Sequence, residues 1–200
     1  MKPALSIVAA VGAIALSATA LQAAPGPSIE DPLGDANFVN DQGTGDGSFG
    51  DFNAADAGTV SDLTAVIFTN DKKNLYVQID TEAEPPAATG IGYRVRVNPD
   101  GPGGSYCLIF EAFHPGANND LTVAKGQVRD ACEGGAPTEV AVVGNTITVP
   151  RKAHKGLAKG ATLKAPQAQS FLYTGTYPSP GFSGPMADTT KVGTDYKLRR

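Results

Sequence analysis

The chain has 200 residues, and its 16 lysines and arginines against 20 aspartates and glutamates give a formal net charge of −4 at pH 7. This mildly acidic balance does not suggest a nucleic-acid partner. The charge is unevenly spread, because residues 1–100 hold 13 acids and 5 bases, whereas residues 101–200 hold 7 acids and 11 bases. The acid is therefore localised in the first half of the chain.

The N-terminus has the three-part layout of a secretory signal peptide. Lys2 precedes an apolar or small run over residues 4–16, and small residues follow at 18–20 and 23–24. A retained membrane anchor is the alternative, but the run is far shorter than the ~20 residues that a spanning helix needs. We expect residues 1–24 to be removed, after Ala20, Ala23 or Ala24, which leaves one secreted, extracellular domain with no membrane span.

The segment over residues 25–62 is acidic and rich in glycine, aspartate and asparagine. Between residues 30 and 62 it holds eight acids and no lysine or arginine. Such a segment is either a hydrated, disordered linker or a set of oxygen ligands for a hard cation such as Ca²⁺, which takes about 6 to 8 oxygen atoms. The candidate ligands of a structural calcium ion are Asp31, Asp35, Asn37 and Asp62.

The spacing of these ligands favours the calcium interpretation. Asp31 and Asp35 are four residues apart on a loop that proline and glycine bend, and Asp62 begins the strand against which this loop should lie. Crowded carboxylates repel one another, and a divalent ion reverses that cost. The EF-hand pattern is not met, because the fifth position counted from Asp35 is Val39.

After residue 60 the chain consists of short β-rich runs separated by turn residues, which predicts strands joined by hairpins. The predicted strands cover residues 63–69, 74–80, 92–98, 105–113, 138–144 and 146–150. Tyr93, Val95 and Val97 alternate with Arg94 and Arg96, so we expect a strand with one face in the core and the other half exposed to water.

The rest of the chain completes an all-β prediction. Residues 170–177 and 194–198 are expected as closing strands, and residues 151–160 as one short helix. With 24 glycines, 15 prolines and closely spaced strands, the sequence favours an antiparallel, jelly-roll-like β-sandwich over residues 63–200 rather than an α/β fold.

The two cysteines predict a disulfide. Cys107 and Cys132 are an even pair in a chain expected to be exported, and their bond would close a loop of about 25 residues. A nucleophilic Cys107 assisted by His114 is the disfavoured alternative.

Each catalytic template lacks a member. Ser183 is followed by Gly-Pro, so Pro185 stands where a nucleophile elbow needs glycine. His114 and His154 have no second histidine or cysteine at zinc-ligand spacing. Glu111 is the one acid in an apolar strand, whereas glycoside hydrolysis needs two carboxyl groups, so we interpret it as an outward-facing residue. We therefore expect no catalytic site.

A compact basic set consists of Arg151, Lys152, Lys155, Lys159 and Lys164. It would suit an anionic partner such as a cell-wall polymer or a phospholipid surface, or it is simply a solvated helix face. No aromatic residue lies between these side chains, and the chain has no tryptophan, so a stacking platform for bases or sugars is missing here.

The sequence "DPLGD" at residues 31–35, followed by "SDLTAVIFTNDKKNLYVQID" at residues 61–80, resembles the first part of family 9 carbohydrate-binding modules and of dopamine β-monooxygenase N-terminal (DOMON-like) β-sandwiches. The resemblance implies a jelly-roll sandwich with a structural calcium bound by the early aspartates. Haem-binding DOMON-like proteins use methionine and histidine ligands, which here would be Met186 with His114 or His154. The whole chain is also similar to secreted bacterial proteins, which implies no activity.

The sequence thus predicts a secreted, non-enzymatic, calcium-stabilised β-sandwich that acts as a binding or surface-interaction module. We expect a monomer whose candidate partner is a cell-surface or cell-wall polymer. One alternative is a secreted hydrolase in which carboxylates such as Glu111 and Asp100 converge only in the fold. The other is a purely structural envelope protein.

Overall fold

The computed structural model describes residues 26–34, 60–84, 89–99, 107–117, 119–178 and 186–199. Within these ranges eleven strands form one sheet in which every pairing is antiparallel. The strands are β1 (Ile29–Glu30), β2 (Leu63–Asn70), β3 (Asn74–Thr81), β4 (Ile91–Pro99), β5 (Leu108–Phe113), β6 (Lys125–Asp130), β7 (Thr138–Val143), β8 (Thr146–Pro150), β9 (Thr162–Leu172), β10 (Met186–Thr189) and β11 (Tyr196–Lys197).

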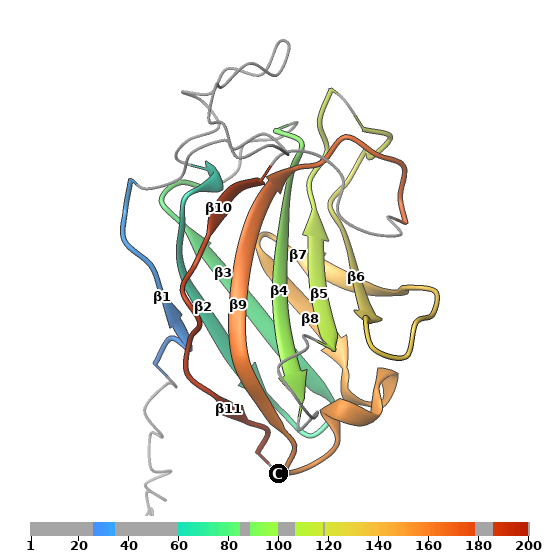
Figure 1. Ribbon diagram of the computed structural model, residues 1–200. Helices are drawn as coiled ribbons and strands as arrows, with labels where there is room; N and C mark the ends of the chain where they lie inside the picture. Colours follow the sequence, from blue (N-terminus) through green and yellow to red (C-terminus); the bar gives the residue numbers. More distant parts are fainter. Residues whose placement is uncertain are drawn as a thin grey trace, which may run out of the picture.

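The sheet has the strand order β1-β2-β3-β8-β7-β6-β5-β4-β9-β10, and β11 pairs with β9. Figure 1 shows it curled, with β9, β4 and β5 in front of β2, β3 and β8. The two edges are tied together, because Thr194 N–H donates to Ser28 O (2.7 Å) and Gly193 N–H donates to Pro166 O (2.8 Å). The antiparallel all-β fold is confirmed, and a sandwich of two separate layers stays a prediction.

Hairpin turns join β2 to β3 and β7 to β8, as the sequence predicts for neighbouring strands. In the β2–β3 turn, Asp71 Oδ1 accepts hydrogen bonds from the backbone N–H groups of Lys73 (2.6 Å) and Asn74 (2.7 Å). In the β7–β8 turn, Gly144 has φ 54°, a conformation that glycine adopts at little cost. These turns fix the register of the strands that they join.

The predicted helix at residues 151–160 is wrong in form. The chain there makes two 3₁₀ turns, η1 (Arg151–Ala153) and η2 (Lys155–Leu157), separated by His154 in an extended conformation with φ −150° and ψ 139°. His154 is the N-cap of η2, and its ring nitrogen accepts the Gly156 N–H. In this extended capping conformation it separates the two 3₁₀ turns, so one continuous helix does not form.

The interior of the curled sheet is apolar. Tyr93, Val95 and Val97 are fully buried in it, as the alternation in β4 predicts. The other face of β4 agrees with the prediction only in part, because Arg96 is half-buried whereas Arg94 is only 1% exposed. A second apolar cluster covers that outer face, formed by Phe113, Phe171 and Tyr173 with Leu121 and Tyr177 packed against it.

The disulfide prediction is confirmed. Cys107 and Cys132 are bonded, with their Cα atoms 4.9 Å apart, and the bond joins the chain before β5 to the chain after β6. Ala131 N–H also donates to Cys107 O (2.6 Å). The disulfide therefore closes the open end of the β5–β6 pair.

Two further observations concern the acidic segment and membrane-spanning helices. The acidic segment contributes a strand of its own, since Ile29 and Glu30 pair with Val66 and Ala65 of β2. Across the described ranges, no helix has the length and apolar character needed to cross a bilayer.

Candidate functional site

The loop after β1 lies against the start of β2, where the sequence predicts a cation site. Asp31 N–H donates to Thr64 O (3.0 Å), which continues the β1–β2 pairing. Gly34, in a left-handed conformation with φ 81°, then donates its N–H to Asp62 Oδ2 (2.5 Å). Two of the predicted ligands, Asp31 and Asp62, therefore belong to segments that contact each other.

The Asp62 carboxylate is buried and incompletely satisfied. Asp62 is 1% exposed, and its Oδ1 has no hydrogen-bond partner among the described residues. Burying a carboxylate oxygen without a partner costs free energy, which a bound cation would offset.

Sequence reasoning missed a second buried acid beside this position. Asp188 of β10 is 7% exposed, and its Oδ2 accepts the backbone N–H of Leu63 (2.8 Å), the residue that follows Asp62. No spacing rule could have found it, because Asp188 follows Leu63 by 125 residues. It fixes the start of β2 to the opposite edge of the sheet.

The remaining predicted ligands, Asp35 and Asn37, lie outside the described residues. Among the residues that the structure does describe, no three histidine, cysteine or acidic side chains are grouped so as to hold a metal ion. The described part of the site is therefore Asp31, Asp62 and the backbone of the loop that ends at Gly34.

Glu111, the acid considered for hydrolysis, is held in a buried ionic cluster on the outer face of the sheet. Arg94 lies directly opposite it on β4, and Gln127 lies opposite it on β6. Arg94 Nε donates to Glu111 Oε1 (2.6 Å), whereas Gln127 Nε2 (2.6 Å) and Arg129 Nε (3.0 Å) donate to Oε2. Both carboxylate oxygens are therefore occupied.

The surroundings of this cluster are apolar. Arg94 also lies over the Phe171 ring, with its guanidinium carbon 5.1 Å from the ring centroid. Burial lowers the pKa of Arg94, and attraction to Glu111 opposes that shift. Glu111 faces outward as the alternation predicts, but it is fully buried, because the Phe113 and Phe171 cluster covers it. Asp100, its proposed catalytic companion, lies outside the described residues.

The two histidines have separate environments. His154 Nε2 contacts Asp130 Oδ2 (2.6 Å), and its Nδ1 accepts the Gly156 N–H (2.9 Å), so both ring nitrogens are engaged. His114 is buried beside Tyr93, with the rings edge to face at 5.6 Å, and burial lowers the pKa of His114. Neither histidine has the free, exposed nitrogen of a general base.

Met186, the candidate haem ligand, is also engaged. Its sulfur accepts hydrogen bonds from Gln169 Nε2 (3.2 Å) and from Thr189 Oγ1 (2.5 Å). These contacts hold the thioether against β9. A haem would have to displace them before the sulfur could bind iron.

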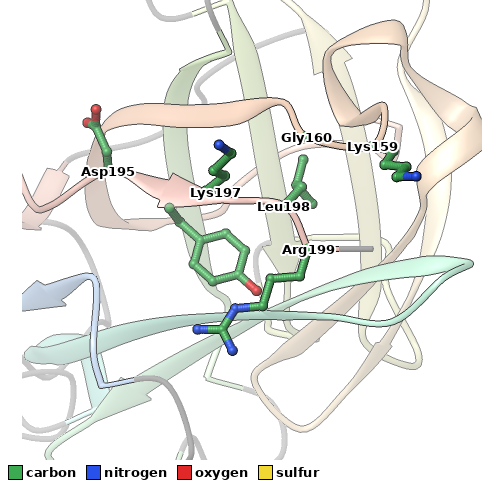
Figure 2. A pocket seen from close by; sticks show the side chains of 7 residues that line it. Lys159, Gly160, Asp195, Lys197, Leu198 and Arg199 are labelled. Carbon is green, nitrogen blue, oxygen red and sulfur yellow. The ribbon is translucent and has the colours of Figure 1, made fainter.

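A pocket of about 720 Å³ lies at the end of the molecule where the chain ends (Figure 2). Charged side chains from the segment after η2 and from β11 surround it, as Figure 2 shows for Lys159, Asp195, Lys197 and Arg199. Two of the basic residues, Lys197 and Arg199, fall outside the basic set predicted from sequence. The sequence alone could not place them in the same pocket as Lys159, because this depends on the pairing of β11 with the beginning of β9.

Comparison with protein-family models, with curated proteins and with solved structures finds no match for this chain.

Proposed function

We propose that this chain is a secreted, non-enzymatic β-domain in which calcium organises the N-terminal loop and which acts as a binding or surface-interaction module. The observation that carries the calcium assignment is the buried carboxylate of Asp62, whose Oδ1 has no hydrogen-bond partner within the described ranges. The Gly34 hydrogen bond to its other oxygen holds the loop of residues 31–34 against this residue.

The chemistry of the surrounding residues fits a hard cation. Calcium prefers carboxylate, amide and carbonyl oxygens, and the acidic segment supplies all three kinds. We assign Asp31, Asp35, Asn37 and Asp62 as the residues that would hold the ion. The acidic segment contains no lysine or arginine after residue 30 that could neutralise these carboxylates instead.

The best catalytic candidates, Glu111 and His154, already use their polar atoms in internal hydrogen bonds, which supports a non-enzymatic role. A general acid or nucleophile needs an oxygen that can reach a substrate, whereas three donors from neighbouring strands occupy both oxygens of Glu111. His154 is likewise bonded at both ring nitrogens. The hydrolase alternative would need Glu111 to leave this cluster.

The binding role is tested with an array of glycans and cell-wall polymers, probed with the mature protein in chelator and in several millimolar calcium. We expect a reproducible hit that strengthens with calcium, and we expect Asp62→Asn to lose the calcium dependence. Glu139→Gln, which removes an exposed carboxylate on β7, is the matched control and should behave as wild type. No hit in either condition would contradict the module and favour the structural alternative.

A further inference from the structure

Three segments that are far apart in sequence meet at one end of the molecule. Arg151 N–H donates to Lys73 O in the β2–β3 turn (2.8 Å), and Arg151 Nη1 donates to Asp71 O (3.0 Å) and to Arg199 O (3.1 Å). Figure 1 shows the β2–β3 turn, the 3₁₀ turns and the C-terminus together at this end. We call it the basic end, formed by residues 71–74, 151–160 and 195–199.

The basic end carries eight lysines and arginines against two aspartates. The cations are Lys72, Lys73, Arg151, Lys152, Lys155, Lys159, Lys197 and Arg199, and the acids are Asp71 and Asp195. Arg151 is partly buried, and the other seven cations are exposed. The face therefore has a strong positive potential.

Internal contacts neutralise little of this charge. Lys155 pairs with Glu133, but no described residue forms a salt bridge with Lys159, Lys197 or Arg199. Asp71 is committed to its own turn, where backbone hydrogen bonds from Asn74 and Lys73 lower its pKa. Arg151 donates to backbone carbonyls, which leaves its charge unbalanced.

The pocket at this end has a fixed framework. Tyr196 and Leu198 are buried beneath it, and the Tyr196 hydroxyl donates to Asn70 Oδ1 (2.9 Å). The same Asn70 oxygen accepts the Arg199 N–H (3.0 Å), and Gly160 N–H donates to Leu198 O (3.2 Å). A framework held in this way lets exposed cations bind an anion without first ordering the backbone.

We propose that the basic end binds a linear polymer of closely spaced anionic groups, and that one such group lies in the pocket lined by Lys159, Lys197 and Arg199. This inference rests on the proposed function as a binding module and names its partner class. A lipid surface is disfavoured, because the exposed large apolar side chains of the described chain, Leu33, Val123, Val143 and Val192, all lie outside the three segments. Nucleic acid is disfavoured because Tyr196, the aromatic residue of these segments, is buried.

The basic end is separate from the cation site. Asp62 precedes β2 and Asp71 follows it, so the eight residues of β2 hold the two sites about 25 Å apart. A polymer at the basic end therefore need not contact the calcium loop. The two sites can therefore be probed with separate variants.

The test measures binding of the mature protein to soluble polyphosphate and to polygalacturonate, two probes that distinguish phosphate from carboxylate as the anionic group. We expect Lys159→Gln with Lys197→Gln to weaken binding at least tenfold. The matched control, Lys125→Gln with Lys191→Gln, loses the same charge elsewhere on the surface and should lose less than threefold. If four anionic groups are engaged, raising the salt from 50 to 200 mM should weaken wild-type binding about 50-fold.

Four results would overturn the inference. Absence of binding to both polymers at low salt would do so, as would equal losses in the two double variants. Tighter binding to phosphatidylglycerol vesicles than to either polymer would replace the polymer with a membrane. A calcium-dependent array hit that both double variants retain would reject the basic end while leaving the proposed binding module in place.

Discussion

The backbone N–H of Gly34 donates a hydrogen bond to the carboxylate of Asp62, 28 residues later in the chain. This contact brings the two ends of the acidic segment together at the start of β2, directly beside the β1–β2 pairing. It places the loop of residues 31–34 at a buried carboxylate, as the calcium proposal requires.

Removing the charge of Glu111 should strongly destabilise the fold. Replacing Glu111 with Gln removes the charge that balances buried Arg94, and breaking a buried pair in this way costs about 3 to 5 kcal/mol. We expect thermal unfolding to show a melting temperature lower by roughly 10 °C. Glu139→Gln removes an exposed pair with Lys125 and should change stability by less than about 0.5 kcal/mol. Equal losses in the two variants would refute a structural role for the cluster.

The disulfide should contribute mainly by restricting the unfolded chain. Its cysteines are 25 residues apart, so replacing both Cys107 and Cys132 with Ser should lower the free energy of unfolding by about 3 kcal/mol. Chemical denaturation of the wild type and the double variant measures this difference. Mass spectrometry of the native secreted protein should find no alkylatable thiol, and two free thiols would show that the bond does not form.

Burial of His114 predicts a loss of stability in mild acid. Its pKa in the folded chain lies below the ordinary value of 6.5, so the unfolded chain takes up the proton first as the pH falls. Stability should therefore be constant above pH 6.5 and decrease below it, with a contribution of up to about 1.4 kcal/mol per pH unit from this residue. His114→Gln should have a shallower slope between pH 6.5 and 5. Identical slopes for the two proteins would assign the effect to other groups.

Local patterns predicted the strands that have apolar residues at alternate positions. β2, β3, β7 and β8 follow the predicted ranges closely, and in β3 and β8 buried residues alternate with more exposed ones as the pattern requires. β6 was missed because only Val128 is apolar within Lys125–Asp130; Gln127 and Arg129 instead serve the Glu111 cluster. The first half of β9 was missed because Pro166 and the left-handed Ala165, with φ 45°, interrupt its pattern.

Of the candidate sites, too, the sequence predicted those that local contacts form and missed those that depend on long-range contacts. The approach of the Asp31 loop to Asp62 could be predicted, because β1 and β2 are joined by the segment in question. The partners of Glu111 could not be, since they depend on the register of β4, β5 and β6. The basic end depends on contacts such as that between Arg151 and Asp71, 80 residues apart, which no spacing rule reveals.

The most direct test of the calcium proposal is the melting temperature of the mature protein in excess chelator and in 10 mM calcium, a probe concentration roughly 10 to 100 times the dissociation constants of extracellular sites. Mass action then predicts a gain of about 1.4 to 2.7 kcal/mol and a rise of roughly 3 to 10 °C in the wild type. Asp62→Asn should lose this rise, whereas Asp195→Asn, at the opposite end of the molecule, should keep it. A wild type that melts at the same temperature in both conditions would contradict the calcium site, and an equal rise in Asp62→Asn would contradict the assignment of Asp62 as a ligand.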